Sequence, residues 1–170
     1  MMFLRDPSAY HGEKNKRPFF EGWYHKLVTG DGQSLAIIPG IYRSGFNNNQ
    51  TAFIMIFDGG NVNVFYERFE VQQFSCSTSS YDLHIGSNYF SSQKIILDIE
   101  SETLTIKGQV TADNLKPWPV TLFEPGCMGW YAYVPTMECF HGILSMDHTL
   151  DGEIEFNGSN YDFVGGRGYI

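Results

Sequence analysis

Apolar and polar residues alternate along most of the chain in short runs that end at turn-forming residues. Such period-two runs are typical of antiparallel β-strands with one buried face. The connectors at 29–32, 58–60, 100–103, 150–152 and 157–160 are rich in Gly, Asp, Asn and Ser, which favour tight turns. The predicted strands are residues 19–28, 34–42, 51–58, 61–69, 80–86, 94–100, 103–110, 130–134, 138–148, 152–156 and 161–164.

Helix contributes little to the predicted fold, because no window of helical length carries an apolar stripe. At most a turn or two is expected, around 112–119, where two prolines oppose it. Several runs are apolar on both faces and need cover on both sides: AIIPGIY at 36–42, AFIMIF at 52–57 and CFHGIL at 139–144. We therefore predict an all-β fold, an antiparallel barrel or strongly curved sheet, with residues 1–170 as a single domain.

Composition narrows the classes of partner. A formal charge of −8 disfavours nucleic acid and anionic membrane surfaces. Fourteen Phe and ten Tyr supply more ring surface than a small core requires. The three cysteines show no CxxC spacing, so we expect no disulfide framework and a reducing, cytoplasmic compartment. The sequence lacks both the apolar core of a signal peptide and a run long enough to span a membrane.

The stretch FFEGWYHK at 19–26 places a carboxylate among rings. On a strand, alternation sends Glu21, Trp23 and His25 to one face and Tyr24 to the other. Glu21 is either an ordinary residue paired with a base such as Arg17, or an inward carboxyl held protonated as a donor in a ring-lined pocket. The residues alone leave both interpretations open, and a nearby Arg167 or protonated histidine would keep an inward carboxyl ionised.

A second polar cluster, MECFHGILSMDH at 137–148, follows the same alternation if it is a strand. Cys139, His141 and Asp147 would share one face, but their spacing matches no strong zinc pattern, so we expect a buried, hydrogen-bonded His141 and no metal. Side chains two residues apart on a strand lie about 7 Å apart, which argues against Cys139 and His141 as a nucleophile and its base. Glu138 and His148 would lie on the opposite face.

The closing stretch FVGGRGYI at 163–170 is rich in glycine but lacks the context and the Lys-Ser/Thr of a phosphate-binding loop. We interpret it as a turn that carries Arg167 toward a carboxylate. Glu21, Glu138 and Asp147 are the candidate partners for a bidentate pair.

Together, in this order and at these separations, FFEGWYHK, AIIPGIY, MECFHGILSMDH and FVGGRGYI resemble the tocopherol cyclase-like family, over about Tyr10 to Ile170. The resemblance implies a lipocalin-like barrel in a two-barrel architecture. It also implies acid-catalysed cyclisation or hydration of an isoprenoid alkene, with no cofactor. The candidate catalytic residues are Glu21, Glu138 and Asp147, and the candidate ligand-binding residues are Trp23, Tyr24, His141, His148, Arg167 and Tyr169.

Two departures from the family pattern qualify this prediction. His25 stands where the family usually has an aromatic residue, and the sequence ends at Ile170 where family members continue into a second half. We therefore expect a first half whose partners are a hydrophobic small molecule and either the missing half or a second copy. The alternatives to catalysis are a non-catalytic, lipocalin-like binding protein and a structural half that acts only with its partner.

Overall fold

The strands form one antiparallel sheet, which confirms the all-β prediction. The computed structural model describes residues 6–13, 18–44, 49–121, 123–134 and 139–170. Two short 3₁₀ turns, η1 (Val71–Gln73) and η2 (Gly129–Tyr133), are the helical elements of these residues. The strands are β1 (Phe19–Gly22), β2 (His25–Val28), β3 (Ser34–Arg43), β4 (Gln50–Asp58), β5 (Asn63–Phe69), β6 (Phe74–Cys76), β7 (Asp82–Ile85), β8 (Asn88–Ser91), β9 (Lys94–Glu100), β10 (Thr105–Asp113), β11 (His148–Phe156), β12 (Ser159–Asp162) and β13 (Gly166–Tyr169).

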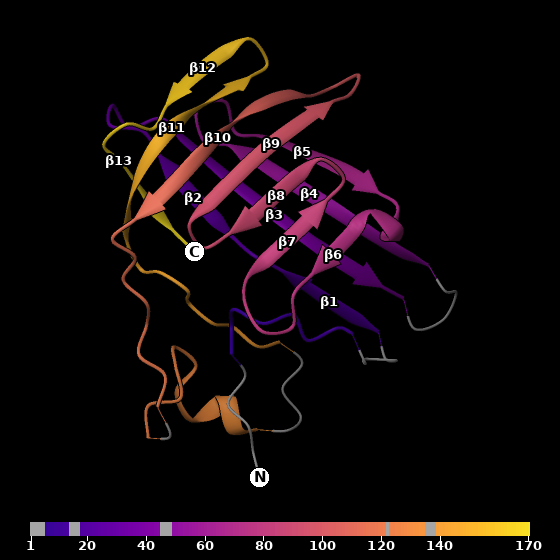
Figure 1. Ribbon diagram of the computed structural model, residues 1–170, viewed down its shortest axis with the longest axis vertical. Coiled ribbons are helices and arrows are strands. Elements are labelled where there is room, and N and C mark those ends of the chain that lie inside the picture. Colours follow the sequence, from indigo (N-terminus) through magenta and orange to yellow (C-terminus); the bar gives the residue numbers. More distant parts are fainter. Residues whose placement is uncertain (1–5, 14–17, 45–48, 122, 135–138) are drawn as a thin grey trace.

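The sheet curls into a nearly closed barrel (Figure 1). Its strand order is β5-β4-β3-β2-β13-β11-β10-β9-β8-β7-β6, with β1 added beside β3 and β12 beside β11. Two contacts tie the β5 edge to the rest of the barrel. Phe65 packs edge-on against Phe156 of β11 at 5.5 Å, and Ser101 Oγ donates to Glu67 Oε1 at 2.8 Å.

Inward-facing apolar side chains fill the barrel. The buried side chains come from strands all around the barrel, for example Leu27, Ile37, Ile54, Phe90 and Ile106. Curling the sheet gives each of these strands a covered inner face, which is why alternating sequence suffices to build the core.

The long connection from β10 to β11 and the N-terminal segment extend from the same end of the barrel (Figure 1). Tyr10 donates its backbone N–H to Ser77 O at 3.1 Å, which ties the N-terminal segment to the residue that follows β6. The backbone N–H groups of Leu144 and Ser145 both donate to Ile170 O. This end of the barrel therefore collects segments from the beginning, the middle and the end of the sequence.

Two predicted strands are wrong. Residues 130–133 of the predicted strand 130–134 fall in the 3₁₀ turn η2, and the described residues 139–147 form no strand before β11 begins at His148. Alternation alone does not make a strand, because a strand also needs a neighbour to complete its ladder. The predicted strand 19–28 is interrupted at Trp23 and Tyr24, and the predicted turn at 150–152 lies inside β11. The pattern also missed β6, β8 and the glycine-rich β13.

Candidate functional site

Glu21, Trp23 and His25 share the inward face of β1 and β2, as the alternation predicted. Trp23 and His25 are 5% and 1% exposed, whereas Tyr24 between them is 44% exposed on the outer face. The register with β3 fixes this orientation, since Glu21 pairs with the buried Ile41. The three inward side chains therefore approach the barrel interior near the end where β2 begins.

Glu21 is paired with a histidine of the N-terminal segment. The backbone N–H of His11 donates to Glu21 Oε2 at 2.9 Å, and His11 Nδ1 lies 2.7 Å from Glu21 Oε1. The Glu21 and His11 side chains are 18% and 27% exposed. A histidine is one of the partners that the sequence left open, and Arg17 lies outside the described residues. The 2.7 Å contact is therefore a direct hydrogen bond between a carboxyl oxygen and a ring nitrogen.

The surroundings of this pair are poorly solvated. Burial raises the pKa of the Cys76 thiol to about 12, and the negative charge of Glu21 adds to the shift. Burial also raises the pKa of the Tyr10 phenol, an effect that nearby Arg43 opposes and Glu21 reinforces. A carboxyl group among such neighbours acts in a medium of reduced polarity.

Two buried polar atoms beside Glu21 lack a hydrogen-bond partner among the described residues: the Tyr10 hydroxyl and Arg43 Nε. Tyr10 is only 7% exposed. Arg43 lies over the Tyr10 ring at 5.9 Å, while its Nη1 donates to Gly12 O at 2.5 Å. The Arg43 guanidinium therefore lies between the Tyr10 ring and the backbone of the N-terminal segment.

Trp23, Tyr81 and His25 form a buried layer behind Glu21. The Trp23 and Tyr81 rings stack at 5.0 Å with an interplanar angle of 15°. The Tyr81 hydroxyl lies 2.6 Å from His25 Nε2. Burial lowers the pKa of His25 to about 3, and neighbouring His148 adds to the shift. His25 is therefore neutral at neutral pH and shares a hydrogen bond with the Tyr81 hydroxyl through Nε2.

Tyr81 is a central residue of this layer that the sequence motifs did not include. It lies in the connection before β7, far along the chain from β1, and only the closure of the barrel brings the two together. In the sequence, Tyr81 is one residue of an ordinary predicted strand, 80–86, and nothing in that pattern indicates contact with Trp23 or His25. Tyr81 also lines a cleft of about 520 Å³, to which the N-terminal segment contributes Ser8 and the β10–β11 connection contributes Leu115 and Leu144.

His148, a predicted ligand-binding residue, is buried at 1% exposure. Its Nδ1 lies 3.1 Å from Ser145 Oγ, and that hydroxyl donates to Asp147 O at 2.9 Å. Burial lowers the pKa of His148, with Asp147 opposing the shift and Arg167 reinforcing it. His148 Nδ1 therefore donates to Ser145, and the imidazole is neutral.

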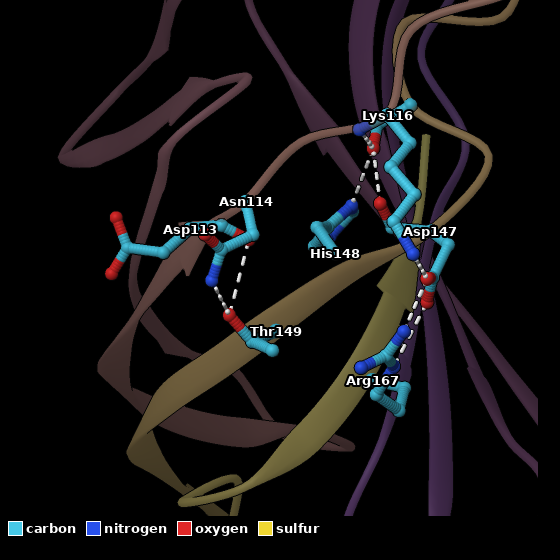
Figure 2. Close-up of polar contacts among 8 residues, drawn as sticks. Asp113, Asn114, Lys116, Asp147, His148, Thr149 and Arg167 are labelled. Atoms are coloured by element: carbon cyan, nitrogen blue, oxygen red, sulfur yellow. Dashed lines mark hydrogen bonds and ion pairs between the residues drawn. The ribbon is translucent and has the colours of Figure 1, made fainter.

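Asp147 is held by two cations, as Figure 2 shows. Lys116 Nζ lies 2.7 Å from its Oδ2, and the Arg167 guanidinium contacts both oxygens, with Nε at 2.8 Å from Oδ1. The hydrogen bonds from Arg167, followed by that from Lys116, lower the pKa of Asp147 to about 2. The bidentate partner of Arg167 is thus Asp147, one of the three candidates, and its two cations favour the ionised carboxylate, which does not favour a role as proton donor.

His141 does not join the inward group: it is exposed, which contradicts the expected burial. Glu138 lies outside the described residues. Cys139 Sγ lies 3.7 Å from His141 Nε2, closer than a strand would allow, because the segment is irregular. Among the described residues, no three His, Cys, Asp or Glu side chains gather as a metal site.

Tyr24 and Tyr169, both predicted to bind ligand, meet on the outer face of the barrel. Their rings contact each other edge-on at 6.3 Å. Tyr24 also lines an apolar groove of about 300 Å³ over β2, β3 and β4. The predicted ligand-binding residues therefore divide between two faces of the same sheet, with Trp23 and His148 inside and Tyr24, Tyr169 and Arg167 outside.

Comparisons of the chain with protein-family models, with curated proteins and with solved structures found no match. The resemblance to the tocopherol cyclase-like family thus rests on the four motifs and stays a prediction. Within the described ranges, no helix has the length and apolar character needed to cross a bilayer.

Proposed function

We propose that the chain is a tocopherol cyclase-like protein that protonates the alkene of a prenylated substrate and so promotes ring closure or hydration. The observation that carries this proposal is that the four motifs lie on or next to neighbouring strands of the sheet. FFEGWYHK contains β1 and β2, AIIPGIY lies in β3, and FVGGRGYI ends in β13. The described part of MECFHGILSMDH leads into β11. Since β3, β2, β13 and β11 are successive neighbours in the sheet, motifs from the whole chain meet in one region.

The proposed proton donor is Glu21 with His11. Glu21 is the inward-facing carboxyl of the candidate set, and the 2.7 Å contact with His11 Nδ1 provides a route by which its proton can be restored. General acid catalysis by a positioned side chain contributes about a hundredfold to ten-thousandfold in rate. Low solvation around Tyr10 and Cys76 strengthens the electrostatic part of such a step.

In the proposed reaction, the proton from this pair forms a C–H bond with one alkene carbon. The alkene's π electrons form that bond, which leaves positive charge on the more substituted carbon. A phenol oxygen of the substrate then forms the C–O bond and releases its proton to the Glu21–His11 pair. Water replaces the phenol in a hydration. Neither outcome changes the overall oxidation state, so the proposal requires no redox cofactor.

The neighbouring side chains are suited to these steps. Ring faces such as that of Trp23 attract positive charge, and the stacked Tyr81 holds Trp23 in place. The buried Tyr10 hydroxyl, which lies beside Arg43 and has no hydrogen bond of good geometry among the described residues, offers a hydrogen bond to the substrate's phenol oxygen. Tyr81 also lines the cleft of about 520 Å³, a volume within the range of small-molecule sites, whereas Glu21 and Trp23 are not among the described residues that line it.

Non-catalytic binding of a hydrophobic small molecule is the second candidate function. It is favoured by the state of Glu21, whose two oxygens both already have a partner on His11. On this alternative, the pair simply fastens the N-terminal segment across the end of the barrel, and the rings bind the ligand unchanged.

The test is to incubate the protein with a panel of prenylated quinols and carotenoid precursors and to separate the products by chromatography. We expect conversion by the wild type and a loss of at least about a hundredfold in Glu21→Gln. Glu155→Gln, an exposed carboxylate on β11, is the matched control and keeps full activity. Ligand that is retained without conversion by folded protein would favour the binding function, and mass spectrometry of organic extracts would identify its class.

A further inference from the structure

The outer face of the sheet carries an apolar groove that the proposed reaction does not use. Its volume is about 300 Å³, and it is lined mainly by side chains of β2, β3 and β4, including Tyr24, Lys26, Ala36, Ile38 and Phe57. Glu21, Trp23 and His25 point to the opposite face of the same strands. The groove is therefore separate from the inward site.

The strand register explains why the surface is hollowed here. Ala36 of β3 lies between Lys26 of β2 and Phe57 of β4, which are its direct partners across the two ladders. A methyl side chain between two longer ones leaves a depression, with Ala36 as its floor. Ile38 lies two residues further along the same face of β3 and extends the apolar lining.

Of the described residues that line the groove, Lys26 alone is charged. Among the described residues, no carboxylate forms an ion pair with it, although other exposed basic side chains, such as Lys107, Lys116 and Arg167, do have acidic partners. The chain as a whole carries a formal charge of −8. An unneutralised cation beside an apolar groove on an acidic protein favours a ligand with one negative charge and an apolar chain.

We propose that this groove binds a single-chain amphiphile with a carboxylate head group, of the fatty-acid class. The carboxylate lies at Lys26 Nζ, and the chain runs over Ala36 between Ile38 and Phe57. The proposal does not depend on the proposed reaction, because it concerns the other face of the sheet.

Size and charge favour this occupant over a membrane or a second copy of the chain. The groove's 300 Å³ is at the lower end for small-molecule sites, which suits one chain. Anionic membranes are recognised by clusters of about four to eight basic residues, whereas the groove has one lysine. The net charge of −8 opposes both an anionic bilayer and self-association.

The experiment is calorimetric titration of the full chain with dodecanoate, dodecanol and dodecylammonium, each below its micelle concentration or solubility limit. Dodecanoate is expected to bind most tightly. Lys26→Gln should weaken dodecanoate about threefold to fivefold and leave dodecanol unchanged. Lys107→Gln, an exposed lysine on β10, is the matched control and should leave both affinities unchanged.

A second pair of variants tests the position of the chain. Ala36→Leu fills the floor and should weaken dodecanoate and dodecanol at least about tenfold, an energy within reach of a few buried methylene groups. Phe57→Gln removes one wall of the groove and should also weaken the binding of dodecanoate and dodecanol. Circular dichroism checks that each variant is folded.

Equal affinity for the three head groups would overturn the proposal, as would dodecanoate binding unaffected by Lys26→Gln and Ala36→Leu. Binding only to anionic vesicles, or dimerisation abolished by Ala36→Leu, would also overturn it.

Discussion

At the scale of single residues, the packing around the buried His148 leaves no space for a side chain at Gly168. Gly168 of β13 pairs with His148 of β11, and a Cβ atom at Gly168 would lie 2.1 Å from His148 Nε2. The buried imidazole thus occupies the space that any side chain at Gly168 would need. Packing around His148 therefore requires a glycine at position 168, the third glycine of the motif FVGGRGYI.

Gly168→Ala should therefore destabilise the fold by about 1–3 kcal/mol, the usual cost of overpacking. Denaturant unfolding measures the change. Gly30→Ala is the control, because its nearest atom, Val164 O, would lie 3.7 Å from the new Cβ. Adding His148→Ala to Gly168→Ala should relieve the clash, and if the double variant shows no such coupling, the packing explanation is wrong.

Tyr81→Phe should cost about 1–3 kcal/mol of unfolding free energy, because it leaves the buried His25 Nε2 without its 2.6 Å partner. The stack on Trp23 is retained, so the loss reports the hydroxyl alone. Tyr89→Phe is a matched control, since Tyr89 lies on the same side of the barrel and is only half-buried. Equal effects of the two changes would contradict the proposed hydrogen bond.

At the scale of elements, tight turns and alternating strands were predictable because their causes are local. The hairpin at 157–160 is an example: Asn157 and Gly158 adopt φ values of 47° and 80°, as the Asn-Gly signal indicates, and join β11 to β12. Gly158→Ala should cost about 1–2 kcal/mol, because an L-residue is strained in this left-handed region. Thermal unfolding measures the loss, and a stability equal to wild type would contradict the turn assignment.

The elements that sequence reasoning misjudged are those decided by distant partners. β13 contains two glycines in four residues and has low strand propensity, yet it gains ladders with both β2 and β11. Residues 139–147 alternate well but are held through Ile170 and Lys116 rather than by a ladder. The same reason explains the site. Alternation correctly placed Glu21 on the face of Trp23 and His25, but only closure of the barrel brings His11 and Tyr81 to that face.

At the scale of the whole molecule, two buried neutral histidines make stability depend on pH. Burial lowers the folded-state pKa of both His25 and His148 below the ordinary value of 6.5. Between the unfolded and folded values, the unfolded chain binds more protons, so stability falls as pH falls below about 6.5. For His25 this loss continues toward pH 3, where its folded-state pKa lies.

The unfolding free energy should therefore decrease between pH 7 and pH 5 by up to about 1.4 kcal/mol per pH unit for each histidine. Asp147 does not interfere in this range, because it is ionised in both states. Denaturant unfolding at several pH values measures the slope. His25→Gln keeps a side-chain acceptor for Tyr81 and should flatten the slope, and an unchanged slope would show that His25 is not responsible.

The barrel wall has a different environment on each face: a carboxyl among aromatic rings on the inner face and an apolar groove on the outer face.

The central claim is that the inward site adds a proton to an alkene. The most direct measurement is conversion of a prenylated quinol in D₂O, followed by mass spectrometry of the product. We predict one solvent deuterium bound to carbon in the cyclised or hydrated product of the wild type, and none formed by Glu21→Gln. Folded wild-type protein that retains the quinol without incorporating deuterium would contradict the claim.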